Sequence, residues 1–258
     1  SAVQVYDGTA EIEGGEFSAT KSNTYVINCI DACWKNGTAK VYIKGGTFHN
    51  FNPANNAAEG PNTNFCARGY STKTENNGDT YTIIPPITIS DESSYEDFLR
   101  SLNDGSYTGS VAAMLTDSIT LTDTFNVPAN ADVYLNLNEH TITVGTDNPN
   151  VDYAFYIEDG GTLTIDGNGT IEATTRAPVM FCPFGDLVIE NGRFIRTIPE
   201  GGYDGDVRSM FMGTSPAGGR YTAGVTINGG YFDSGYYDAN AKDIEEYLAG
   251  TKVLEETA

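Results

Sequence analysis

The chain has 258 residues, enough for one or two domains, and its 29 glycines, 16 tyrosines and 12 phenylalanines are typical of a turn-rich, β-prone protein. Its formal net charge of −21 repels phosphate backbones and anionic membranes, which disfavours nucleic-acid binding. Because no run of apolar residues is long enough to cross a bilayer, membrane insertion is not expected either.

Residues 1–50 contain two copies of a short motif: an aliphatic residue, a glycine-rich polar turn, and an aromatic residue five positions after the first. The copies are residues 12–17 and 43–48. Further copies follow at residues 137–142, 165–171 (one residue longer), 189–194 and 227–232. The glycines expected at the turns are Gly14, Gly15, Gly45, Gly46, Gly192, Gly229 and Gly230.

Copies that recur roughly every 20 to 40 residues are typical of repeat proteins in which each repeat forms one coil. Aliphatic residues alternate with polar ones before each turn, which predicts strands with one buried face. We therefore predict an all-β fold, a right-handed parallel β-helix (solenoid) with short capping helices. Glycine at each corner would supply the positive φ that a sharp turn needs.

The first residues read directly as a strand, residues 2–6, without a helix before it. We expect a processed or excised end here, and an open coil edge that pairs with another chain.

Four cysteines, Cys29, Cys33, Cys66 and Cys182, are too few for a disulfide framework. Two interpretations remain open: small buried hydrophobic residues, or a disulfide that joins Cys29 or Cys33 to Cys66.

The repeat lapses between residues 50 and 80 into asparagine, proline, glycine and threonine, and Pro85-Pro86 ends the strand that follows. We predict one domain at residues 1–85 and a second β-helix module at 86–258. Residues 93–103 predict an amphipathic helix with a serine N-cap, laid over the first coil of the second module. A second helix is predicted at residues 238–250.

The end of the first module resembles the closing segment of pectate-lyase-like right-handed β-helix repeats. The residues that carry this resemblance are 45–48, 51–56, 59–60, 63–65, 67, 69–70 and 81–83. Residues 135–142 resemble the opening coil of the same group, with Glu139 where glycine is usual. Such repeats occur in large proteins of gut bacteria and of their tailed, crAss-like phages.

The resemblance implies a virion appendage or an extracellular, cell-surface protein used for assembly or attachment, with no catalytic signature. The expected partners are other copies of the chain, in a homo-oligomer built as a side-by-side trimer or by head-to-tail stacking, or else other virion proteins. A host-surface glycan is the expected ligand. A bacterial adhesin and a polysaccharide depolymerase or lyase are the alternatives. We expect partners at residues 50–86 and at the end that begins with Ser1.

The depolymerase alternative would need clustered carboxylates with a basic partner. Acidic candidates are Asp152, Glu158, Asp159, Asp166 and Asp186, with Arg176, Arg193 and Arg208 as partners. Stacked coils would bring Asp166 close to Glu190, although polar residues at a solvent-facing corner are the ordinary outcome and explain both without catalysis.

Aromatic residues are candidates for carbohydrate contacts: Trp34, Tyr231, Tyr236 and Tyr237. Asp204 and Asp206 lie in a glycine-rich loop that suits either a calcium site or a solvated turn. His49 and His140 both lie beside strand corners and have no nucleophile nearby in the sequence.

Overall fold

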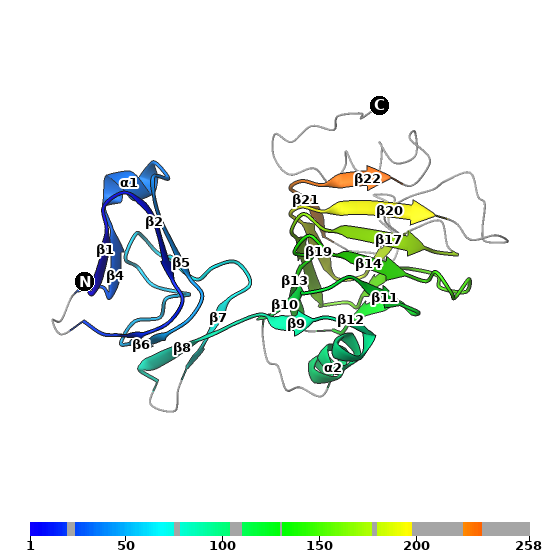
Figure 1. The fold of residues 1–258 in the computed structure, drawn as a ribbon, viewed down its shortest axis with the longest axis horizontal. Helices are drawn as coiled ribbons and strands as arrows, with labels where there is room; N and C mark the ends of the chain where they lie inside the picture. Colours follow the sequence, from blue (N-terminus) through cyan, green and yellow to red (C-terminus); the bar gives the residue numbers. More distant parts are fainter. Residues whose placement is uncertain are drawn as a thin grey trace. The chain divides into compact units, whose positions relative to one another are not determined.

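The computed structural model describes residues 1–19, 24–74, 78–103, 110–129, 131–176, 180–197 and 224–233. The chain forms two compact units, Ser1–Pro86 (unit 1) and Ile87–Ala258 (unit 2), each with its own apolar core (Figure 1). The described residues of both units consist mainly of strands arranged in parallel sheets, so the prediction of an all-β fold is confirmed. The predicted helix at residues 238–250 lies outside the described residues.

Unit 1 begins with two passages of the chain through three short parallel sheets. The strands of the first passage are β1 (Val3–Val5), β2 (Gly8–Ile12) and β3 (Glu16–Phe17). Those of the second are β4 (Ile27–Cys29), β5 (Ala39–Ile43) and β6 (Thr47–His49). Each strand pairs in parallel with its counterpart, β1 with β4, β2 with β5 and β3 with β6. The two motif copies are therefore in register, with Ile12 beside Ile43 and Phe17 beside Phe48.

Residues 50–84, here called the closing segment, supply a partner to every strand of the second passage. The Glu59 carboxylate accepts a hydrogen bond from the backbone N–H of Cys29 in β4. Ile43 in β5 bonds through its backbone to Phe65 and Ala67, each at 2.9 Å. Strand β8 (Thr80–Ile84) pairs antiparallel with β6 and with β7 (Ser71–Thr74). Apart from one parallel bridge between Ile43 and Cys66, the described residues of this segment continue none of the parallel sheets of unit 1.

Short helix α1 (Asp31–Lys35) lies between β4 and β5. Trp34 from α1 packs edge-on against Phe65, with ring centroids 5.5 Å apart. The helix therefore packs against the core of unit 1 through Trp34, although none of its residues is fully buried.

Unit 2 repeats the parallel arrangement over more passages, and consecutive strands pass from one sheet to the next in a constant order. The first sheet contains β9 (Ile87–Ile89), β10 (Ser110–Leu115), β13 (Asp132–Asn136), β16 (Thr162–Asp166), β19 (Asp186–Ile189) and β21 (Val225–Ile227). The second contains β11 (Ile119–Leu121), β14 (Thr141–Val144), β17 (Thr170–Thr174), β20 (Arg193–Thr197) and β22 (Tyr231–Asp233). The third contains β12 (Phe125–Val127), β15 (Phe155–Ile157) and β18 (Phe181–Pro183). Figure 1 shows the strands of the second sheet stacked one above another from β11 to β22.

Like residues lie above like along these sheets and form the core of unit 2. A ladder of phenylalanines runs through it, with ring centroids 5.0 Å apart for Phe125 and Phe155 and 5.3 Å for Phe155 and Phe181. Each of these three rings is essentially inaccessible to solvent. Burial of aromatic side chains in this way is a large part of the hydrophobic stabilisation, because each ring removes much apolar area from water.

The register of strand pairing in unit 2 shows that the sequence-based alignment of the copy at residues 137–142 was wrong at its start. Ile165 pairs with Leu135, not with Leu137, and Ile142 pairs with Ile171. The corner after Leu135 is therefore longer than in the other copies, and Leu137 itself is buried in the core. Asn138 and Glu139 form its turn with φ values of 45° and 65°. Glu139 thus occupies a left-handed position of the kind that glycine takes at other corners.

Helix α2 (Glu92–Asn103) covers the beginning of the unit 2 core. The ring of Tyr95 lies tilted against that of Phe125, with centroids 4.9 Å apart, and Phe98 is 1% exposed. The Glu92 carboxylate accepts hydrogen bonds from the Thr122 hydroxyl at 3.1 Å and the Thr122 N–H at 3.3 Å, just after β11. A helix laid over the first strands in this way hides an edge that would otherwise pair with other chains.

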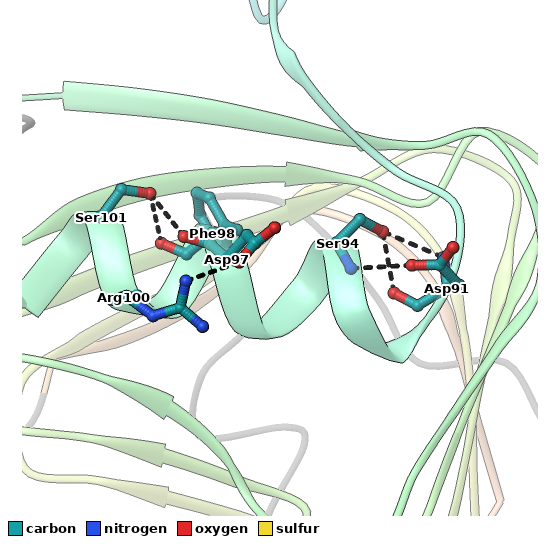
Figure 2. Close-up of polar contacts among 6 residues, drawn as sticks. All are labelled: Asp91, Ser94, Asp97, Phe98, Arg100 and Ser101. Atoms are coloured by element: carbon teal, nitrogen blue, oxygen red, sulfur yellow. Dashed lines mark hydrogen bonds and ion pairs between the residues drawn. The ribbon is translucent and has the colours of Figure 1, made fainter.

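The N-cap of α2 is Asp91, which corrects the prediction of a serine cap. Figure 2 shows the Asp91 carboxylate accepting a 2.7 Å hydrogen bond from the Ser94 N–H. In return the Ser94 hydroxyl accepts a 3.0 Å hydrogen bond from the Asp91 N–H, which is the reciprocal arrangement of a capping box. The exposed face of the helix carries an Asp97–Arg100 ion pair at 2.7 Å.

Candidate ligand-binding site

The closing segment of unit 1 encloses a solvent-open pocket of about 400 Å³. Its wall is formed by the turn at residues 50–57, by the start of β8 and by Tyr25, which precedes β4. The lining residues are Tyr25, Asn50, Phe51, Asn52, Asn55, Asn56, Ala57, Asp79 and Tyr81. The volume lies within the range of small-molecule sites, which runs from roughly 300 to 1,000 Å³.

Two of the four asparagines hold the turn in shape. The Asn52 side-chain oxygen accepts hydrogen bonds from the Ala54 N–H at 3.0 Å and the Thr72 hydroxyl at 3.1 Å. The Asn56 amide donates to the backbone carbonyls of Asn52 and Thr63, and its oxygen accepts from the Ala58 N–H. The wall is therefore built by side-chain-to-backbone bonds, which favour turns over regular strands.

The floor of the pocket is anchored in the core of unit 1. Phe51 is 5% exposed, and its ring lies 6.4 Å from those of both Phe48 and Phe65. A 2.7 Å hydrogen bond from the Asn50 N–H to the Asp79 carbonyl ties the turn to the strand that carries Tyr81. The pocket thus stands on packed residues and its shape does not depend on a ligand.

Among the described residues, the pocket lining contains one charged side chain, the carboxylate of Asp79, and no lysine, arginine or histidine. Glycoside hydrolysis requires a pair of carboxyl groups. The amides and phenols of the lining offer hydrogen-bond donors, acceptors and aromatic surface, and its described residues include one carboxyl group instead of such a pair.

The sequence-predicted carbohydrate contacts lie elsewhere. Trp34 packs into the unit 1 core against Phe65. Tyr231 begins β22, is 37% exposed, and has the Arg193 guanidinium 4.9 Å above its ring. The other two predicted contacts, Tyr236 and Tyr237, lie outside the described residues.

The predicted calcium ligands Asp204 and Asp206, and the predicted partner Arg208, also lie outside the described residues. Within the described ranges, no group of three His, Cys, Asp or Glu side chains is arranged to hold a metal ion. In the same part of the chain, no helix is both long and apolar enough to cross a membrane.

The register does bring together the predicted acidic pair of unit 2. Asp166 follows Ile165, Glu190 follows Ile189, and these two isoleucines pair directly between β16 and β19. The Tyr134 hydroxyl donates a hydrogen bond to the Asp166 carboxylate, whose residue is 7% exposed. Asp166 therefore serves as an acceptor for the neighbouring coil.

Other predicted acidic residues have structural contacts or lie exposed. Glu158 accepts a 3.0 Å hydrogen bond from the Ala129 N–H. Exposed candidates are Asp152, Asp159, Arg176 and Asp186.

His49 bridges three strands, since one ring nitrogen lies 2.7 Å from the Glu16 carboxylate and the other lies 3.2 Å from the Thr80 hydroxyl. His140 ends the longer corner, where its N–H donates a 2.8 Å hydrogen bond to the Leu137 carbonyl.

All four cysteines are free thiols, so the disulfide interpretation is wrong. Cys29 and Cys182 are fully buried in the core. Burial raises the pKa of the Cys29 thiol to about 11, with a further contribution from the Glu59 carboxylate, and burial raises that of Cys182 to about 11. A thiol with a raised pKa is a weak nucleophile, because the thiolate is the reactive form.

The repeat glycines lie at the corners of the coils. Positive φ values between 113° and 130° occur at Gly15, Gly46, Gly192 and Gly230. Gly45 is required for a different reason: a Cβ there would lie 2.2 Å from the Glu13 carbonyl oxygen of the preceding coil.

Sequence reasoning marked the segment that contains the pocket but not the residues that form it. The density of asparagines at residues 50–56 is visible in the sequence, whereas Tyr25 lies far from them and no motif marks it. Only the antiparallel return of β8 brings Tyr81 back beside the turn. Comparison of this chain with family models, with curated proteins and with solved structures finds no match in any of the three.

Proposed function

We propose that this chain is a non-catalytic structural and adhesive protein with a right-handed parallel β-helix in each unit, and that it forms part of a phage virion appendage. In this role it would assemble with other copies of itself, as a trimer or by head-to-tail stacking, or with other virion proteins. It would attach to host-surface glycans.

The observation that carries the proposal is the order of the strands in unit 2. From β10 to β20, consecutive strands enter the first, second and third sheet in turn and pair in parallel with the strands of the next passage, as β13 does with β16 and β14 with β17. Such stacking builds a rigid, extended scaffold from short repeats. A scaffold of this kind suits an appendage that displays a binding surface.

The pocket of unit 1 supports a role in binding a ligand and not in hydrolysing it. Its lining offers amide, phenol and aromatic groups together with one carboxylate, Asp79. These groups recognise a ligand by hydrogen bonds and apolar contact, whereas hydrolysis would need a second carboxyl group at a defined separation.

Electron microscopy tests the assignment directly. Antibodies raised against the chain should label fibres or capsid-associated appendages on phage particles purified from the source culture. Label confined to the surface of bacterial cells would instead favour the alternative of an adhesin, and label on neither would overturn the proposal.

A polysaccharide depolymerase or lyase is the second candidate, and the neighbouring positions of Asp166 and Glu190 are the observation that favours it. The test is incubation of the purified chain with capsular and plant polysaccharides, followed by assays for new reducing ends and unsaturated products. Product formation that Asp166→Asn or Glu190→Gln abolishes would establish the enzyme and overturn the non-catalytic proposal.

A further inference from the structure

Two asparagines in the pocket differ from the two that shape it. Asn52 and Asn56 are engaged with the backbone of the closing segment. Among the described residues, the side chains of Asn50 and Asn55 make no hydrogen bond, and both are exposed. Each amide offers a donor and an acceptor at the mouth of the pocket.

The backbone of both residues is held by hydrogen bonds, which leaves their side-chain amides unused. Asn50 has a left-handed φ of 54°, and its N–H is bonded to the Asp79 carbonyl. The Asn55 N–H donates a 3.2 Å hydrogen bond to the Asn52 carbonyl. Because the backbone at both positions is ordered before any ligand arrives, no backbone entropy is lost there when one binds, and only the side-chain torsions become fixed.

Two tyrosine rings face the same pocket. Tyr25 is 41% exposed, and Tyr81 is half-buried on β8, opposite Phe48. A solvent-exposed tyrosine that lines a cavity together with polar groups indicates a ligand-binding site, because it presents an apolar ring and a hydroxyl to the same ligand.

The charge of the pocket restricts the ligand. Among the described lining residues, Asp79 is the one ionised group and none is cationic, so these residues do not offset the charge of a phosphate, sulfate or uronate. The net charge of −21 adds to this repulsion. A neutral ligand rich in hydroxyl groups matches the amides, and its C–H faces match the tyrosine rings.

We propose that this pocket binds a short segment of a neutral saccharide, with Asn50 and Asn55 bonded to its hydroxyl groups and Tyr25 and Tyr81 packed against its sugar rings. This inference rests on the proposed function and names the ligand class through which the chain would attach.

The test begins with the purified full chain on an array of neutral, uronate-containing, sialylated, sulfated and amino-sugar glycans. The neutral glycan that gives the strongest signal is then titrated calorimetrically. Binding should weaken about tenfold in Asn55→Ala and in Asn50→Gly, which removes the amide but permits the positive φ. Tyr25→Ala should weaken it at least as much, and Tyr25→Phe should weaken it less because the ring remains.

Tyr42→Ala is the matched control, since Tyr42 is 40% exposed on β5 and does not line the pocket. Its affinity should equal that of the wild type, and thermal unfolding should show that all variants fold.

Equal affinity in every pocket variant would overturn this inference while leaving glycan attachment standing. Binding confined to acidic or amine-bearing glycans would overturn the neutral ligand class. A wild-type chain that binds no glycan while antibodies still label the appendage would overturn the pocket proposal but not the appendage assignment.

Discussion

The two units close the ends of their parallel sheets by different means. In unit 2, helix α2 inserts Tyr95 and Phe98 into the core over the first strands. In unit 1, the closing segment satisfies the strands of the second passage with Glu59, with the backbone around Cys66, and with an antiparallel strand. Helix α2 forms an apolar cap, which leaves little polar surface available. The closing segment forms a hydrogen-bonded, polar cap, and its residues line most of the pocket. The candidate site therefore belongs to the polar cap.

The largest expected effect on stability comes from a substitution that weakens the apolar cap of unit 2. Phe98→Ala should destabilise unit 2 by about 3–5 kcal/mol, because the lost ring is 1% exposed and leaves a cavity. Urea titration followed by hydrogen exchange should show the loss in peptides of unit 2. Because each unit has its own core, equal loss of protection in unit 1 would contradict the comparison.

A corner substitution tests how closely the coils of unit 1 stack. Gly45→Ala should cost about 3 kcal/mol, because its Cβ would lie 2.2 Å from the Glu13 carbonyl oxygen and backbone must move. Gly14→Ala is the matched control at the same corner of the first coil, where no atom lies within 4 Å of the added Cβ. Equal denaturation midpoints for the two variants would show that the coils are not stacked as described.

The polar cap is tested at its most connected asparagine. Asn56→Ala should cost about 1–2 kcal/mol, since it leaves the Thr63 carbonyl and the Ala58 N–H without their side-chain partner. Asn55→Ala in the same turn should change stability by less than about 0.5 kcal/mol, because its side chain makes no such bond. Thermal unfolding distinguishes the two, and a reversed order would refute the division into structural and ligand-binding asparagines.

The smallest effect concerns the start of α2 and depends on pH. The Ser94 N–H lowers the pKa of the Asp91 carboxyl from its ordinary value of 3.8 by donating to the carboxylate. Since the folded pKa is the lower one, this stabilisation is complete above pH about 4 and is lost as pH falls through the folded pKa. Asp91→Ala should lower the Tm slightly at pH 7 and should match the wild type more closely at pH 2. A Tm difference independent of pH would rule out the carboxylate as the cap.

The repeat itself was predictable because its signal is local. Alternating aliphatic residues, a glycine corner and an aromatic residue five positions on specify strands and a turn in four of the copies, and Ile12 and Ile43 pair as that pattern requires. The amphipathic pattern of α2 is local in the same sense. The longer corner was misaligned because Leu135 and Leu137 are both buried, and hydrophobicity alone does not distinguish them.

By itself, the sequence determined an all-β chain with parallel repeats, a change of pattern after Phe48 and a helix after Pro86, since each of these depends on residues that are neighbours in the chain. Only the tertiary structure decided which residues share the pocket. Tyr25, Asn55 and Tyr81 meet because β8 reverses direction against β6, and long-range pairing of this kind depends on packing and register that no local pattern records.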